Sequence, residues 1–424
     1  MRYLPLKHPR LIPTTYLVTF QIAQLANMTT TISTEKQTIK LIFLWSILWI
    51  CVPFGIYFLS HIVHPDWYKH FVYQASGFLQ GRLDLFNLPS YYVDLIYWKD
   101  KIYLPNPPLP SILLMPFVAI LGIATEQIRV CMLFGAVDVF LVWILLGRMA
   151  VQGALRVGIT ILYGFGTVHY SASIIGTIWF YAHVVAEWGM LLALVEFFGK
   201  RRFALIGFFM GLAFLSRQAT ILGSLFFLGW LVWERPEKWI QKGLSFGVGF
   251  APPFLFQSWF NWARFGDPME SGYMLQNYYS SVQAPAIDKY GLFNKAYIPK
   301  HIKLIFTEMP EFLPQFPFVR PKPEGMNIWL TTPAFFALFT ANWFDVFVIL
   351  AGLSAFLISL PAMIYTATGW VQFGYRYALD YLPFLFVAIA SGLQRMPKAL
   401  TWVLIALSVI VNVWGVYWVV KLGW

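Results

Sequence analysis

The chain has 424 residues, of which 59% are hydrophobic and only 12% are charged. A soluble protein of this length needs far more charge to cover its surface, so lipid is expected to surround most of the chain. The formal net charge is +11, yet the lysines and arginines are scattered between apolar runs, so membrane topology explains them and a nucleic-acid partner is excluded. The cysteines Cys51 and Cys131 lie in apolar runs and build neither a disulfide framework nor a thiolate metal site.

Residues 1–40 mix polar and apolar residues and include several basic ones. They predict a cytoplasmic N-terminal tail ahead of a single transmembrane domain at 41–424. A membrane-crossing helix needs about 20 predominantly apolar residues, and several runs reach or approach this length. They predict an all-α polytopic membrane protein of about eleven transmembrane helices, with a large first outer loop that carries interface helices. The expected spans are 41–60, 129–147, 156–169, 175–198, 203–216, 219–233, 243–261, 327–343, 346–367, 381–394 and 401–420.

The orientation of the chain is predicted from the basic residues of its short loops, which tend to stay in the cytoplasm. All of these loops fall inside only if the apolar run 109–124 does not cross the membrane. Pro110 and Pro116 interrupt this run, and such a segment is tolerated at the interface or where protein or water covers its backbone. If the run 109–124 does cross the membrane, the predicted topology places the basic cluster at 200–202 on the outer side. We therefore predict a multi-pass protein of the plasma (inner) membrane, with the N-terminus in the cytoplasm and the C-terminus outside.

This topology leaves two long outer loops, at about 61–128 and 262–326, while the inner loops are short and basic. Most of the ionisable residues that remain then gather at the outer face. Any loop of a membrane protein is polar, so one such residue alone means little. Convergence from several separate segments, in contrast, indicates a functional site.

Two aspartates of the first outer loop are candidates for a general base. Asp66 comes soon after the first span, where a carboxylate can accept a proton from an attacking hydroxyl, although it equally suits a solvated residue that caps the next helix. Asp94 is bracketed by aromatic residues, as a sugar-binding carboxylate would be, but the same aromatics suit a membrane-interface belt. Further candidate substrate contacts in the outer loops are His70, Arg264, Tyr91, Tyr92, Tyr97, Trp98 and Tyr103.

Arg376 and Asp380 stand four residues apart in the last outer turn, so on a helix they share a face and can simply pair. Alternatively, the guanidinium of Arg376 can clamp a lipid phosphate in two-pronged geometry. Arg217, in a tight outer hairpin, competes for the same role. Asp380 is kept as a further substrate contact.

Some ionisable residues are expected inside the membrane. His183 and Glu187 are spaced i, i+4 within one span, and Asp138 lies midway along another. Such residues are costly in lipid and face the interior of a helix bundle. They indicate either a proton relay or a buried structural pair, and His183, about two turns below the outer end of its span, is also a candidate substrate contact.

The sequence gives no firm sign of a cofactor. His61, His64 and His70 fall within ten residues, but neither a His-Glu-x-x-His motif nor a compact carboxylate cluster joins them, so a divalent metal is not expected. No Walker loop, no Gly-x-Gly-x-x-Gly after a strand and no Asp-x-Asp is present, which excludes a soluble nucleotide-sugar fold. The spacing Gly207-x-x-x-Gly211 is typical of close helix packing.

Four stretches carry a resemblance to a known family: Asp66 followed by 75–83 (Ala-Ser-Gly-Phe-Leu-Gln-Gly-Arg-Leu), 105–110 (Pro-Asn-Pro-Pro-Leu-Pro), 211–217 (Gly-Leu-Ala-Phe-Leu-Ser-Arg) and 369–380. They resemble the GT-C superfamily of integral membrane glycosyltransferases, particularly the bacterial branch related to protein mannosyltransferases and lipid A aminoarabinose transferases. The resemblance implies a GT-C-like fold, an acidic residue soon after the first span and a sugar donor on a polyprenyl phosphate. Asp66 is followed by Trp67 where the family often has glutamate, which keeps Asp94 open as the base.

The resulting hypothesis is an enzyme at the outer face that moves a sugar from a polyprenyl-phosphate donor to an acceptor hydroxyl with inversion. Asp66 or Asp94 is the expected base, and Arg376 or Arg217 is expected to hold the phosphate. Besides membrane lipid, the other partner is an acceptor that the sequence does not specify: a glycolipid, a polysaccharide or a protein. The alternatives are a secondary transporter, which would use the ionisable residues inside the membrane, and a lipid-linked polysaccharide polymerase or ligase.

Overall fold

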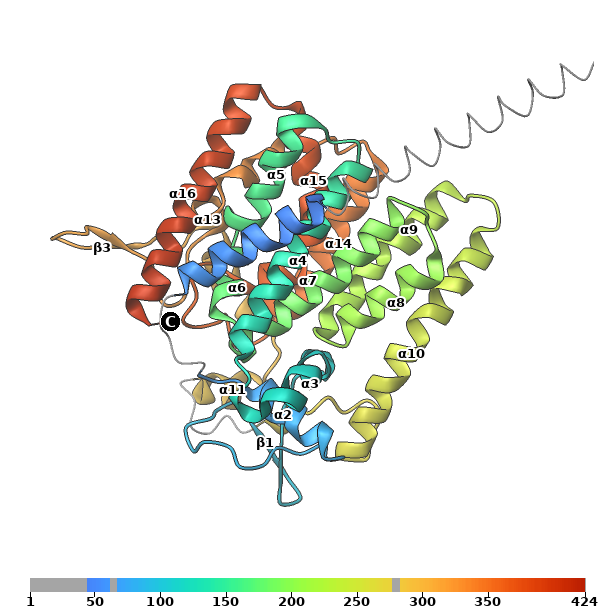
Figure 1. Cartoon of the computed structure of the whole chain (residues 1–424), viewed down its shortest axis with the longest axis vertical. Helices are drawn as coiled ribbons and strands as arrows, with labels where there is room; N and C mark the ends of the chain where they lie inside the picture. The colour runs from blue at the N-terminus through green and yellow to red at the C-terminus, as the bar shows by residue number, and fades with distance from the viewer. Residues whose placement is uncertain (1–43, 62–66, 277–282, 424) are drawn as a thin grey trace, which may run out of the picture. The chain divides into compact units, whose positions relative to one another are not determined.

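The computed structural model describes residues 44–61, 67–276 and 283–423, most of which are helical (Figure 1). The chain divides into two units, Met1–Trp49 and Ile50–Trp424. Of the first unit, the structure describes only the start of the apolar helix Leu44–Ser60. The predicted tail at 1–40 lies outside the described residues.

The second unit is built mainly from α-helices, with short 3-10 helices and strands between them. The α-helices are α2 (His70–Leu79), α3 (Leu109–Leu121), α4 (Gln127–Arg148), α5 (Gly153–Phe165), α6 (His169–Ile175), α7 (Ile178–Phe197), α8 (Phe203–Phe214), α9 (Ser224–Glu234), α10 (Trp239–Phe265), α11 (Ala284–Tyr290), α12 (Ile298–Phe306), α13 (Ile328–Thr331), α14 (Val346–Met363), α15 (Leu382–Arg395) and α16 (Lys398–Leu422). The 3-10 helices are η1 (Gly122–Ala124), η2 (Gln218–Gly223), η3 (Tyr273–Leu275), η4 (Lys295–Tyr297), η5 (Pro333–Phe339) and η6 (Arg376–Asp380).

The strands form two small antiparallel pairs. β1 (Ile96–Trp98) pairs with β2 (Lys101–Tyr103), with Ile96 opposite Tyr103, and β3 (Glu311–Phe312) pairs with β4 (Val319–Arg320). The elements α2, α3, β1 and α11, which come from the two predicted outer loops, lie together at the lower end of Figure 1. The two outer loops therefore meet at one end of the bundle.

Four helices in the described part of the chain are long and apolar enough to cross a membrane: α4, α7, α14 and α16. Several others are apolar but shorter, among them α3, α5, α8 and α15. The prediction of an all-α membrane protein is confirmed. The count of about eleven spans and the orientation of the termini stay predictions. Whether α3 crosses the membrane is also still a prediction, although its 13 residues are fewer than the roughly 20 that a crossing needs.

The helix α7 lies at the centre of the bundle. It packs against α4, α6, α8 and η6, and 83% of its most apolar stretch is buried. A helix that is apolar all round is expected to be enclosed by other helices. Its ionisable side chains, His183 and Glu187, consequently face protein and not lipid, and both are buried.

The expected span at 327–343 is not one helix, and this prediction is wrong. The side chain of Asn327 accepts a hydrogen bond from the Leu330 backbone and starts α13, which ends at Thr331. Proline disfavours helical backbone in the residue before it and has no N–H to donate, so the chain turns at Thr332 and continues from Pro333 as the 3-10 helix η5.

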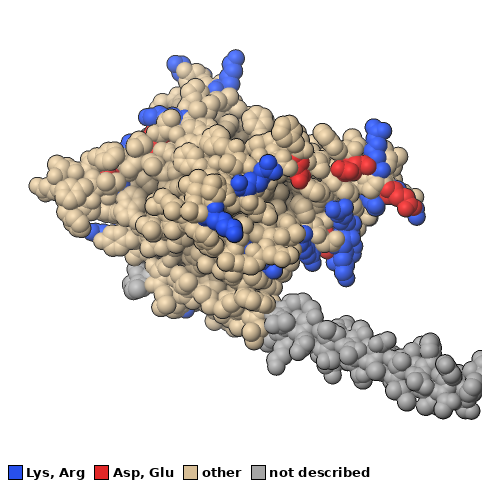
Figure 2. All heavy atoms as spheres, turned by 90° about the horizontal axis from the view of Figure 1, so that it is seen from above, with Lys and Arg blue, Asp and Glu red and all other residues tan. Residues whose placement is uncertain are grey.

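Charged residues are sparse on the surface. Figure 2 looks at the molecule from above and shows separate groups of lysine and arginine side chains, with few acidic ones, on an otherwise uncharged face. This sparse charge agrees with a chain whose natural solvent is largely lipid.

Close packing of α8 on α10 depends on glycine. A Cβ added at Gly207 would lie 2.0 Å from the carbonyl oxygen of Phe246, and one added at Gly211 would lie 2.7 Å from Cγ of Pro253. The spacing of these glycines therefore serves helix packing, as the sequence predicts.

We expect Gly207→Ala to lower the free energy of unfolding by about 1–3 kcal/mol, because the added methyl group must push the α10 backbone away. Gly247→Ala is the matched control, since nothing lies within 4 Å of a Cβ at that position on α10. That variant should keep or slightly raise the stability, because alanine favours helix by up to about 1 kcal/mol. Thermal unfolding in detergent measures the stability of the two variants. Equal melting temperatures for Gly207→Ala and Gly247→Ala would contradict the packing argument.

Candidate functional site

A cavity of about 960 Å³ is lined by residues that are far apart in the sequence. The first outer loop contributes Asp94 and Asn106, and the turn after α8 contributes Arg217. The start of α7 and the residue before it contribute 177–180, Ala182 and His183. The rest of the lining comes from Tyr273 in η3, the end of α14 and the segment 367–380. A cavity of this size suits a ligand as large as a sugar phosphate.

Three of the predicted site residues meet at one carboxylate in the cavity wall. Arg217 donates from Nε and Nη2 to the Asp380 carboxylate, with its shortest distance, 2.9 Å, between Nη2 and Oδ2. His183 donates from Nδ1 to Oδ1 of Asp380 over 2.7 Å. This network joins α7, the turn after α8 and η6.

The ionisation of Asp380 follows from these contacts. Burial by itself would raise the pKa of this carboxyl, but the charge of Arg217 and the hydrogen bonds from Arg217 and His183 outweigh it. The pKa of Asp380 is therefore lowered below its ordinary value of 3.8. Asp380 is held as a carboxylate, and it neutralises the charge of Arg217.

Arg376 is a second guanidinium in the cavity wall, and its charge is not neutralised in the same way. Among the described residues, no carboxylate lies within 4.0 Å of it, and its Nη1 donates to the carbonyl oxygen of Trp370 over 3.1 Å. It packs 5.3 Å from the ring centre of Phe180 and is only 8% exposed. A largely buried cation without an anionic partner is suited to bind an anionic ligand.

Asp94 presents a carboxylate to the same cavity. It is partly exposed, and its Oδ2 accepts a hydrogen bond of 2.7 Å from Nε1 of Trp179. Its backbone is left-handed, with φ of 58°, a conformation that aspartate and asparagine adopt more readily than most residues. The carboxylate thus has one fixed donor and remains open to a ligand.

His70 supports the turn that carries Asp94 and does not line the cavity. Its Nε2 lies 3.1 Å from the carbonyl oxygen of Val93, and its ring stacks on Tyr92 with the ring centres 4.2 Å apart. Burial lowers the pKa of His70, which favours the neutral ring. The ring therefore donates to the backbone just before Asp94.

The remaining predicted contacts lie away from the cavity lining. Tyr92 is buried against His70, and Tyr97 is 60% exposed. Arg264 is buried and donates from Nη1 to the carbonyl oxygen of Leu104 over 2.7 Å, so it holds the backbone next to the cavity residues 105–106. Asp66 lies outside the described residues, and its proposed role as base stays a prediction.

Two of the pairings considered from spacing are wrong. Arg376 and Asp380 belong to the 3-10 helix η6, in which residues four apart do not share a face, and Asp380 pairs with Arg217. His183 and Glu187 do share α7, but Glu187 contacts His169 and Tyr163 and not His183. Asp84, in contrast, pairs with its near neighbour Arg82.

Sequence reasoning missed several aromatic residues that line the cavity. Trp179 and Phe180 begin α7, Tyr273 comes from the second outer loop and Trp370 precedes η6. Aromatic residues at the ends of spans are usually assigned to the membrane interface, so their type alone does not reveal them. The useful signal is position: Trp179 and Phe180 stand one turn before His183.

Part of the cavity lining is apolar. It includes Ile128, Ile175, Phe293, Pro361 and Ala362. Because Pro361 and Ala362 belong to the span α14, the cavity reaches a helix that is expected to border lipid. The same cavity therefore offers contacts to both a charged group and a hydrocarbon chain.

No family model matches the chain, and no curated protein matches it. Among solved structures, the chain is similar to ArnT from Cupriavidus metallidurans bound to undecaprenyl phosphate, with a TM-score of 0.45 and 14% sequence identity. The likeness covers 84% of this chain and 61% of the ArnT chain. This chain therefore spans less than two thirds of the length of ArnT. A likeness this distant carries no argument about function.

We expect Asp380→Asn to lower the free energy of unfolding at pH 7 by about 3–5 kcal/mol, because it leaves the buried guanidinium of Arg217 unpaired. The lowered pKa of Asp380 makes the carboxylate stabilising above its ordinary pKa of 3.8, and this contribution is lost as the pH falls through the lower folded-state pKa. The difference between the variant and the wild type should thus shrink below about pH 4. Thermal unfolding at several pH values measures it.

Asp84→Asn is the control for this experiment. Asp84 is buried but pairs with an arginine whose side chain is 47% exposed, so Asp84→Asn leaves a solvated guanidinium and should cost about 1 kcal/mol or less. Equal losses in the two variants would contradict a central role for the Asp380 network.

Proposed function

We propose that this chain is a GT-C-type membrane glycosyltransferase that transfers a sugar from a polyprenyl phosphate to an acceptor hydroxyl at the outer face of the membrane. The observation that carries the proposal is the presence of an unneutralised guanidinium, Arg376, and an open carboxylate, Asp94, on one cavity. Stretches that resemble the GT-C superfamily supply part of its lining: Asn106, Arg217 and residues from 369–380.

Arg376 is the proposed partner of the donor phosphate. Its guanidinium can form two parallel hydrogen bonds with phosphate oxygens, and burial strengthens the attraction. As the bond between sugar and phosphate breaks, negative charge grows on the phosphate, and a preorganised cation stabilises that charge best. Arg217 is less suited to this task, because Asp380 already occupies its Nε and Nη2 donors.

Asp94 is the proposed general base, with Asp66 as the alternative. In this step the acceptor hydroxyl gives its proton to the carboxylate, and its oxygen forms a bond to the anomeric carbon. The bond from that carbon to the phosphate oxygen breaks, and polyprenyl phosphate leaves with the electron pair. Attack from the face opposite the leaving group inverts the anomeric centre. The Trp179 hydrogen bond fixes one Asp94 oxygen and leaves the other for the hydroxyl.

The rest of the lining suits the other parts of such a donor. Aromatic rings such as Trp179, Trp370 and Tyr377 offer faces for a sugar, and the apolar wall with Ile128 and Pro361 offers a path for the first isoprene units. The donor would then lie with its chain toward lipid and its sugar toward the outer loops.

A secondary transporter is the second candidate. The observation that favours it is the buried cluster of Asp138, His169 and Glu187 among helices of the bundle, since such residues mark ion pathways in transporters. Purified protein incubated with radiolabelled polyprenyl-phosphate sugars decides between the two. Release of polyprenyl phosphate supports the transferase, whereas uptake into vesicles without release supports the transporter.

We expect Asp94→Asn to lower turnover about 10²–10⁴-fold, because asparagine keeps the shape of the side chain but does not accept the proton. Binding of the donor should remain. Asp100→Asn is a matched control, since Asp100 lies in the same loop, is exposed and has a similar left-handed φ of 60°. Release of radiolabelled polyprenyl phosphate measures the rates.

Asp66→Asn is measured beside Asp94→Asn. A loss confined to Asp66→Asn would move the base to Asp66, and full activity in both variants would refute the aspartate mechanism.

We expect Arg376→Gln to weaken the binding of polyprenyl phosphate at least about tenfold, because a charge-assisted hydrogen bond contributes about 1.5–3 kcal/mol. Arg376→Lys should be intermediate, because it keeps the charge but loses the fork. Arg320→Gln is the control, since Arg320 pairs with Glu311 between β3 and β4. Titration in detergent measures the affinity, and an unchanged affinity for Arg376→Gln would remove Arg376 from the phosphate site.

A further inference from the structure

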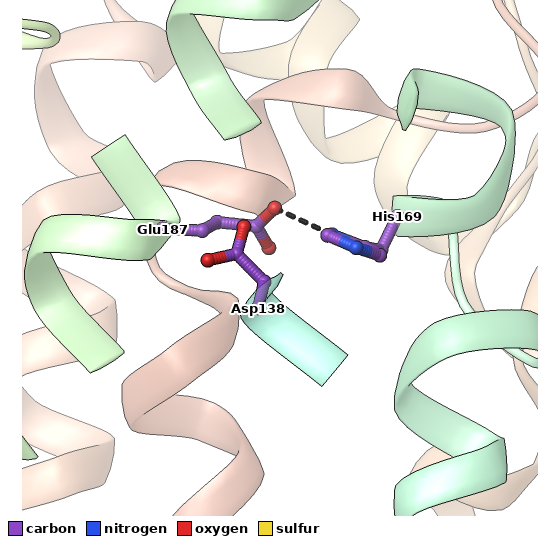
Figure 3. Close-up of side chains that lie close together, drawn as sticks. All are labelled: Asp138, His169 and Glu187. Atoms are coloured by element: carbon purple, nitrogen blue, oxygen red, sulfur yellow. Dashed lines mark hydrogen bonds and ion pairs between the residues drawn. The ribbon is translucent and has the colours of Figure 1, made fainter. Parts of the chain in front are cut away.

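A second cluster of ionisable side chains lies inside the bundle and outside the cavity lining. It consists of Asp138 on α4, His169 at the start of α6 and Glu187 on α7, all fully buried. One donor atom from each lies within 4.8 Å of the others. Figure 3 shows the two carboxylates side by side, with the His169 ring directed at Glu187.

The hydrogen bonds orient two of these side chains. Nε2 of His169 lies 3.1 Å from the carbonyl oxygen of Gly135, and because a carbonyl only accepts, Nε2 carries the hydrogen. Nδ1 therefore faces the cluster, 2.8 Å from Oε2 of Glu187. The hydroxyl of Tyr163 donates to Oε1 of Glu187 over 2.9 Å.

Asp138 is different, because neither of its carboxylate oxygens has a hydrogen-bond partner among the described residues. Within the same residues, no lysine or arginine lies within 4.0 Å of Asp138 or Glu187. Two carboxylates in a dry interior are costly unless positive charge balances them. His169 can supply at most one positive charge. The cluster therefore keeps a net negative charge when both carboxylates are ionised.

We propose that Asp138, His169 and Glu187 bind a divalent transition-metal ion such as Zn²⁺ or Mn²⁺. A neutral imidazole and two carboxylates form a donor set that suits these ions, and the charge of the ion balances both carboxylates. Donors of one ion with bonds of about 2.0–2.2 Å lie roughly 3–4.4 Å apart, a spacing that this cluster approaches.

The surroundings resemble those of known metal sites. A histidine ligand usually donates its other N–H to a backbone carbonyl or a carboxylate, and ligating carboxylates are themselves hydrogen-bonded. The contacts of His169 with Gly135 and of Glu187 with Tyr163 have this form. The ion would tie α4, α6 and α7 together.

Gly135 lets α6 lie close to α4 beside the cluster. A Cβ added there would lie 2.2 Å from Oγ of Ser173 and 3.4 Å from Nε2 of His169. A larger residue would clash with Ser173 on α6, the helix that also carries His169.

The first test is the metal content of the full-length protein, purified in detergent without a metal-affinity step and measured by inductively coupled plasma mass spectrometry. We expect about one equivalent of a divalent transition metal in the wild type and less than about a tenth of that in Asp138→Asn and His169→Gln. Asp345→Asn is the control, because asparagine caps α14 as aspartate does and should leave the metal in place.

The second test is thermal unfolding. Chelation should lower the melting temperature of the wild type, and adding Zn²⁺ or Mn²⁺ alone should restore it, whereas Asp138→Asn should not respond to either. The proposal is overturned if the wild type holds no metal and does not respond to chelation or added metal. In that case a proton on Asp138 balances the cluster, and Asp138→Asn should be as stable as the wild type. The wild-type measurements decide this even if a variant does not fold.

Discussion

In the wall of the cavity, segments far apart in the sequence are joined through one buried carboxylate, Asp380, which accepts hydrogen bonds from Arg217 and His183. These residues come from η6, from the turn after α8 and from α7, so one ion pair and one hydrogen bond to the same carboxylate hold three segments together. Each partner is costly to bury alone, and the network is therefore stable only when it is complete. The position of the other cavity residues follows from this frame, because Trp179 belongs to α7 and Arg376 to η6.

This network also separates the roles of the two arginines. The charge of Arg217 is neutralised by Asp380 inside the protein, whereas Arg376 contacts a backbone carbonyl and aromatic rings. Only Arg376 is therefore proposed to bind the donor phosphate. A site that used both cations for substrate would have to break the frame that shapes it. In the proposed arrangement Arg217 supports the structure and Arg376 binds the ligand, so this conflict does not arise.

Much of the helical layout could be predicted from apolar run length, because lipid requires helices of a certain length and the pattern shows them directly. The sequence predicts Asp94, His183, Arg217, Arg376 and Asp380 as site residues, and the structure brings them to one cavity. Their pairing could not be predicted, because spacing rules assume an α-helix and η6 is a 3-10 helix. Tyr97 lies outside the cavity lining, because it stands on β1, where neighbouring side chains point to opposite faces and Ile96 is the buried one. The cluster around Asp138 has no local motif at all, because its members stand on three helices.

The left-handed backbone of Asp94 has a consequence for how the sequence can drift over generations. Glycine and asparagine tolerate this conformation best, and neither can take up a proton, while glutamate would keep the acid but suit the turn less well. If Asp94 is the general base, as proposed, no other amino acid both suits this backbone and accepts the proton equally well. Among diverged descendants of this chain, those that retain aspartate and those that have lost it would form two separate groups, with few intermediates between them.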